Sequence, residues 1–136
     1  MTTLSLDTAE RIAKAAVANA RANGRKPMGI AVIDAGGNLK FALREDGSNL
    51  AAIEIAEGKA RAALTFGCTS KQIADGLSGN SLAGPSVLAV LKGRIVLLGG
   101  GVPIKDADGT IIGAIGGAGG PPDHDEEVVL AGAGAV

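Results

Sequence analysis

The sequence predicts an α+β fold in which a five-stranded antiparallel sheet is flanked by helices, in the order α-ββ-αα-βββ-α. Short apolar runs arrive in pairs separated by turn-forming residues, which is typical of hairpins and therefore of antiparallel strands. Helical patterns stand between these pairs, so we expect the helices to pack on the faces of the sheet. No internal repeat or linker interrupts the 136 residues, which are expected to form one domain over residues 1–136.

The first half of the chain predicts two helices and one hairpin. A capping-box spacing at residues 7–10 opens a helix over residues 7–22, which stops at Gly24. Residues 28–33 and 39–43 are apolar runs joined by the turn Asp34-Ala35-Gly36-Gly37-Asn38, so we expect an antiparallel pair. Asp46-Gly47-Ser48 then opens a second helix that carries Leu50 on its apolar face and ends at Gly67.

The second half of the chain predicts a short helix, three strands and a last helix. The spacing from Thr69 to Gln72 is that of a capping box, and it is followed by a polar loop over residues 78–85. Residues 87–91 and 94–98 flank Lys92-Gly93 and are expected to form a second hairpin. A fifth strand is expected over residues 111–115 and a last helix over residues 125–133.

Charge and composition exclude several classes of protein. The net charge is −1, with 13 basic and 14 acidic residues interspersed, so we expect no nucleic acid and no membrane as partner. No basic, apolar leader opens the sequence, and we expect a cytoplasmic protein whose single Cys68 is an inert thiol. The chain is 46% apolar with a mean hydropathy of +0.30, which predicts a homo-oligomer.

Glycine is concentrated in one part of the chain. Half of the 22 glycines lie after position 98, on both sides of a short apolar strand. Because glycine permits positive φ angles and close backbone approach, these runs predict a ligand pocket or a subunit interface. They match neither a phosphate-binding P-loop nor a dinucleotide-binding turn.

Six short motifs, in this order, resemble those of the GlcG/HbpS family of small haem-binding proteins, whose domain also forms the C-terminal half of PduO-type proteins. The motifs are Val32-Ile33-Asp34-Ala35-Gly36-Gly37, Arg44-Glu45-Asp46-Gly47, Lys59-Ala60-Arg61-Ala62-Ala63, Gly100-Gly101-Val102-Pro103-Ile104, Gly113-Ala114-Ile115-Gly116 and Asp125-Glu126-Glu127. The resemblance implies a profilin-like sheet, assembly into tetramers or octamers, and haem or a related tetrapyrrole as cofactor.

The candidate site residues come from these motifs and from the single histidine. Arg44, Asp46 and Lys59 are expected to hold a carboxylate, such as a haem propionate or a small organic acid. The predicted cofactor-binding set is Arg44, Lys59, Gly100, Gly101, Pro103, Gly116, Gly117 and Asp125. His124 is the only imidazole and therefore the only candidate histidine ligand or neutral-pH general base; Met28 and Thr65 remain alternative haem ligands. No metal-ligating residues are assigned.

Three functions stay open at this point. The leading one is a cytosolic haem-binding accessory or sensor protein. The second is an enzyme that performs proton transfer or elimination on a carboxylate metabolite, with His124, Lys59 and Asp46 as catalytic residues. The third is an oligomeric structural protein without a ligand.

Overall fold

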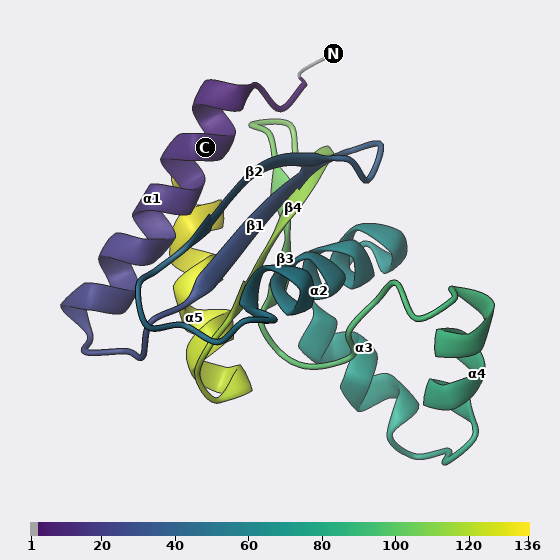
Figure 1. Ribbon diagram of the computed structural model, residues 1–136. Helices are drawn as coiled ribbons and strands as arrows, with labels where there is room; N and C mark the ends of the chain where they lie inside the picture. Colours follow the sequence, from purple (N-terminus) through teal and green to yellow (C-terminus); the bar gives the residue numbers. More distant parts are fainter. Residues whose placement is uncertain (1–2) are drawn as a thin grey trace.

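The computed structural model describes residues 3–136, which form five helices and a four-stranded sheet (Figure 1). In chain order the elements are α1 (Leu6–Ala22), β1 (Gly29–Asp34), β2 (Leu39–Arg44), α2 (Ala52–Phe66), α3 (Ser70–Leu77), α4 (Ala83–Val90), β3 (Gly101–Lys105), β4 (Ile111–Ala118) and α5 (Pro122–Ala133).

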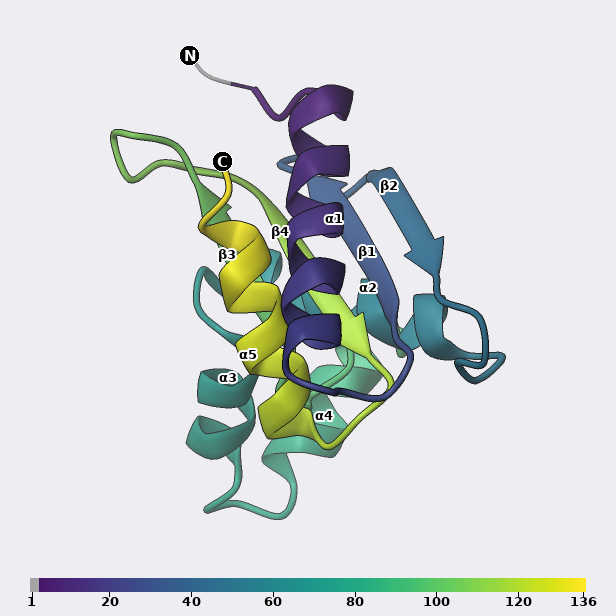
Figure 2. The ribbon, with the colours of Figure 1, turned by 90° about the vertical axis from the view of Figure 1, so that its left-hand side faces the viewer.

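The sheet has the strand order β2-β1-β4-β3, and every neighbouring pair is antiparallel. Helices α1 and α5 lie side by side on one face, and α2 lies on the other (Figures 1 and 2). Helix α3 packs on α2, and α4 packs on α3 at the periphery of the molecule. The α+β class predicted from the hairpins and the intervening helices is therefore confirmed.

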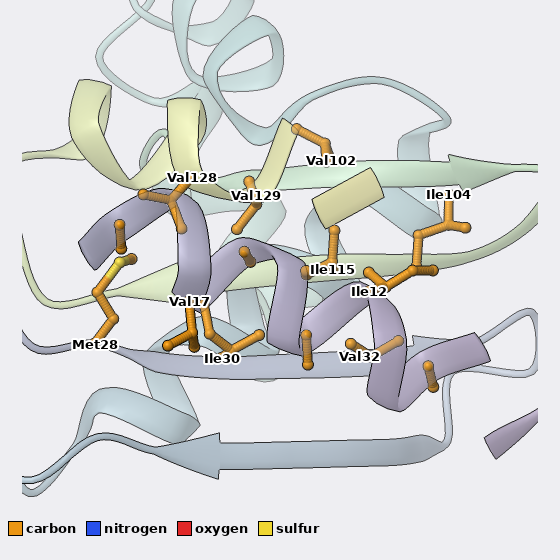
Figure 3. Close-up of a cluster of buried hydrophobic side chains, with 14 of the residues drawn as sticks. Ile12, Val17, Met28, Ile30, Val32, Val102, Ile104, Ile115, Val128 and Val129 are labelled. Carbon is orange, nitrogen blue, oxygen red and sulfur yellow. The ribbon is translucent and has the colours of Figure 1, made fainter. Parts of the chain in front are cut away.

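The main core lies between the sheet and the α1–α5 face, and it is built without aromatic rings at its centre (Figure 3). Alternate strand residues point toward these helices, as the period of two in a strand requires. The largest fully buried side chains of this cluster are Ile12, Met28, Ile30, Val32, Val102, Ile104, Ile115, Val128 and Val129. Branched aliphatic side chains thus supply most of the buried apolar area.

The opposite face of the sheet is packed much more closely, because α2 presents alanines to it. Ala56, Ala60 and Ala63 are fully buried. Gly101 and Gly116 are partners in the β3–β4 register and lie beneath the helix. A Cβ at Gly116 would collide with the carbonyl oxygen of Ala56, and one at Gly101 with that of Lys59. The backbone of α2 therefore rests directly on the backbone of the sheet.

Several local predictions are confirmed, and the starts of three helices are shifted; the last of them, α5, begins at Pro122, three residues earlier than expected. The hairpin of β1 and β2 forms as expected, and Thr69 and Gln72 make the predicted capping box of α3. The first helix begins one residue earlier than expected, because Ser5 and not Asp7 caps it by accepting a hydrogen bond from the Thr8 N–H. Leu50 precedes α2 and is 93% exposed, so its assignment to the buried helix face was wrong.

The predicted second hairpin is wrong. Residues 87–90 belong to α4, and residues 94–98 pair with no strand; instead the Val96 N–H donates to the carbonyl of Gly58 on α2. Lys92 and Gly93 do have positive φ angles, of 57° and 69°. They end a helix, because the Gly93 N–H donates to the carbonyl of Leu88. Residues with positive φ occur both in hairpin turns and at helix C-termini, and a short apolar run is compatible with either a strand or a helix.

One strand was missed, and the expected total of five strands is not found in residues 3–136. Strand β3 follows Gly99 and Gly100 and contains Gly101 and Pro103, and both glycine and proline are depleted in strands. It forms because it is an edge strand, where a proline without an N–H is tolerated. No helix within residues 3–136 is both long enough and apolar enough to cross a membrane.

Candidate functional site

The most unusual polar feature of the interior is a buried ion pair between Lys59 on α2 and Asp125 on α5. Their side chains are 3% and 2% exposed, and Lys59 Nζ lies 3.0 Å from Asp125 Oδ2. Lys59 also donates to the carbonyl of Gly117, and Asp125 Oδ1 accepts from the Gly120 N–H, each at 3.0 Å. Two buried charges are tolerated only when they are paired and hydrogen-bonded, and these are both.

Glycines make room for this ion pair. A Cβ at Gly100 would lie 2.9 Å from Lys59 Nζ and 2.8 Å from the carbonyl oxygen of Gly117. Gly100 has a φ of 124°, and its carbonyl accepts a 2.8 Å hydrogen bond from the Gly117 N–H. Lys59 and Asp125 come from helices on opposite faces of the sheet, so the pair ties the two layers together.

The structure thus brings together most of the predicted cofactor-binding set. Lys59, Gly100, Gly117 and Asp125 meet at the ion pair, and Gly101 and Gly116 lie beside them under α2. The space beside these glycines is filled by α2 and by core side chains. Pro103 is half-buried within β3.

Arg44 and Asp46 lie elsewhere, on a groove between α1 and β2 that has a volume of about 480 Å³. Val17, Ala18 and Leu43 form its apolar floor. Its rim carries three cations, Lys14, Arg21 and Arg44, against the two carboxylates of Glu45 and Asp46.

Sequence reasoning missed the α1 side of this groove. Lys14, Val17, Ala18 and Arg21 follow the i, i+3, i+4, i+7 spacing of one helix face. This amphipathic stripe with cations at its ends was the signal available. Glu45 links β1 to α1 at one end of the groove. One of its carboxylate oxygens accepts a hydrogen bond from the Met28 N–H just before β1 at 3.0 Å, and the other accepts from Arg21 Nε on α1 at 3.2 Å.

His124 occupies a third place, at the start of α5. Its Nε2 lies 3.3 Å from a guanidinium nitrogen of Arg25, and the same guanidinium donates to Glu127 at 2.7 Å. The imidazole is partly exposed. Because an arginine can only donate, Nε2 accepts a hydrogen bond from Arg25 only in the neutral tautomer that carries its proton on Nδ1.

The three residues expected to be catalytic are therefore in three different settings. Lys59 is buried against Asp125, His124 is bonded to Arg25, and Asp46 lines the α1–β2 groove. Of the alternative haem ligands, Met28 is 1% exposed within the main core. Thr65 is exposed near the end of α2, and its hydroxyl donates to the carbonyl of Arg61 at 2.7 Å.

The fold and the motifs define a small α+β protein of a known family. Residues 4–134 match the family model described as haem-degrading protein HbpS-like. The chain belongs to this HbpS-like family. A search of curated protein sequences found no match.

Solved structures of several relatives share the whole fold. The crystal structure of HbpS is 34% identical, with a TM-score of 0.87 over 100% of this chain and 92% of that one. The Klebsiella pneumoniae protein ORFY is 26% identical, with a TM-score of 0.88 over 99% and 91% of the two chains. A haem complex of PduOC is 26% identical, with a TM-score of 0.86 over 99% and 96%.

Proposed function

We propose that this protein is a haem-binding accessory or sensor protein and that the groove between α1 and β2 is where it holds the cofactor. Membership of the HbpS-like family, together with a structural neighbour solved as a haem complex, is the observation that carries this function. The groove is favoured because it joins an apolar floor to a rim with three cations and two carboxylates, and because it contains two of the residues expected at the site, Arg44 and Asp46.

The residues of the groove fit the organic part of haem. A porphyrin ring needs an apolar surface, which Val17, Ala18 and Leu43 provide. The two propionates need cations. Arg44 suits them, because within residues 3–136 only one of its nitrogens is engaged, by the Ser48 carbonyl at 3.1 Å. When bound, haem supplies iron redox and ligand chemistry, whose axial partners are usually His, Cys, Met or Tyr. None of these lines the groove, so an axial ligand from this chain would have to come from outside the lining.

The first prediction is that haemin binds this protein with a Soret shift that saturates at about one haem per subunit. Ala18→Glu places a carboxylate on the apolar floor at an exposed helical position, and Arg44→Gln removes a propionate partner. Each is expected to weaken haemin binding by about 10-fold or more, since a charged hydrogen bond contributes roughly 1.5–3 kcal/mol. Absorbance titration measures both effects.

Arg11→Gln is the matched control, because Arg11 is an exposed arginine that donates to a backbone carbonyl, as Arg44 does, and does not line the groove. A titration that shows only the linear slope of nonspecific haemin would refute haem binding as the function. Saturable binding that Ala18→Glu and Arg44→Gln leave unchanged would keep the function and remove the groove as its site.

We further propose that the protein is a homo-oligomer, with a tetramer or octamer expected from the family resemblance. Large apolar side chains remain at the surface of the single chain, among them Leu50 at 93%, Leu130 at 52% and Leu39 at 49% exposure. Contact with other copies would remove this surface from water. Light scattering at micromolar concentration is expected to give at least a dimer, and a monomeric mass would contradict the proposal.

A further inference from the structure

Thr65 lines two hollows, and neither of them shares a residue with the groove between α1 and β2. The first is an apolar cleft of about 380 Å³ between the end of α2 and α4. Its lining residues are Thr65, Phe66, Ser86, Val87, Val90 and Leu91. The second is a recess of about 590 Å³ bordered by Arg61, Thr65, Arg94 and the turn between β1 and β2. Because Thr65 borders both, the apolar cleft opens beside the polar recess.

The recess offers a cation without an acceptor. Arg61 is already engaged, since it donates to Glu57 at 3.1 Å and to the carbonyl of Gly37 at 3.2 Å. The side chain of Arg94 makes no hydrogen bond or ion pair with any residue in the range 3–136. No carboxylate lines either hollow; Asp34, in the adjoining turn, directs Oδ1 to the Gly36 and Asn38 N–H groups. The charge offered to a ligand is therefore positive.

The apolar wall of the cleft is held in place by the rest of the fold. Val87, Leu88 and Leu91 pack against the buried Ile73 and Ile95, so one side of α4 is anchored. Val90 is 78% exposed and Phe66 is 46% exposed, and both face the cleft. A concave apolar surface beside a charged side chain that is free to bind has the usual character of a small-molecule site.

We propose that the cleft and the recess together bind an amphipathic organic anion, whose apolar body lies between α2 and α4 and whose carboxylate accepts from Arg94. Medium-chain or aromatic carboxylates have this chemistry. The charge of Arg94 supplies the complementarity, and a planar guanidinium binds a carboxylate through two parallel hydrogen bonds. This ligand is distinct from haem and its site shares no residue with the α1–β2 groove.

The test uses the full chain and the fluorescent anion 8-anilinonaphthalene-1-sulfonate as probe, with decanoate as competitor. The wild type is expected to bind the probe saturably and to release it to decanoate. Arg94→Gln is expected to weaken binding by about 10-fold, and Val90→Glu to abolish it by placing a negative charge in the cleft. Leu82→Glu is the matched control for Val90→Glu, since Leu82 is 73% exposed just before α4 and does not line the cleft.

Three results would overturn the proposal. The first is probe binding that Arg94→Gln and Val90→Glu leave at the wild-type value. The second is a wild type that binds no probe, together with a Val90→Glu variant of lower mass by light scattering, which would make a second copy of the chain the occupant. The third is displacement of the probe by one equivalent of haemin, which would make the cleft the haem site. Arg44→Gln should leave probe binding unchanged.

Discussion

Replacing Gly116 with valine is expected to destabilise the protein by about 3 kcal/mol or more, enough to leave much of it unfolded at physiological temperature. A Cβ at this position would collide with the carbonyl oxygen of Ala56, which belongs to the backbone of α2. A side chain can rotate away from an intruding methyl group, but a helix backbone can only move as a whole. Thermal and urea unfolding measure the loss, and Gly101→Val is expected to behave alike because it would meet the carbonyl of Lys59.

Gly79→Val is the control for this prediction. A Cβ at Gly79 would meet no atom within 4 Å, and its φ lies outside the left-handed region. We therefore expect the change in its stability to stay within about 0.5 kcal/mol of wild type, as for most surface substitutions. Melting curves of Gly116→Val and Gly101→Val that match those of Gly79→Val would show that α2 does not need this close approach.

Lys59→Met is expected to cost about 3–5 kcal/mol, since it leaves the carboxylate of Asp125 buried without its cation. Methionine nearly matches the length of lysine, so the loss reports the charge and its hydrogen bonds more than the packing. The double variant Lys59→Met with Asp125→Asn removes both charges and is expected to recover roughly half of the loss, because no unpaired charge remains. Urea unfolding of the two single variants and the double variant gives the interaction free energy between Lys59 and Asp125.

Lys71→Met is the matched control, because it removes an exposed lysine from its ion pair with Asp75. Such pairs contribute about 0.5 kcal/mol or less. A Lys59→Met variant that unfolds at the same urea concentration as Lys71→Met would disprove a structural role for the buried pair. Normal haemin binding by folded Lys59→Met protein would in turn separate the ion pair from cofactor binding.

The elements that the sequence predicts well are those with strong local signals. Helix α1 has a long apolar periodicity, α3 has its capping box, and the β1–β2 turn has Gly37 at a φ of 81°. The region from residue 83 to residue 105 has weak or conflicting signals. Its apolar run became a helix, and its proline-containing segment became a strand at the edge of the sheet. Whether such a segment becomes a helix or a strand depends on the elements that it packs against in the folded molecule.

The candidate site residues divide in the same way. Their chemical types were visible: a lone histidine, a lysine and an aspartate in motifs, and a concentration of glycine. Their groupings were not, because Lys59 and Asp125 are 66 positions apart and meet only when α2 and α5 pack on opposite faces of the sheet. Arg44 and Asp46 likewise acquire Lys14 and Arg21 as neighbours only when α1 lies against β2.

By itself the sequence determined the α+β class, the family and the concentration of glycine after position 98, since these follow from local periodicity, turn chemistry, ordered motifs and composition. Only the tertiary structure decided what the glycines do. Gly101 and Gly116 let the backbone of α2 approach the sheet, and Gly100 leaves space for the Lys59 ammonium. The physical reason is that a glycine in the sequence indicates a place where a side chain would not fit. Which element occupies the space beside that glycine is decided by contacts between residues far apart in the sequence.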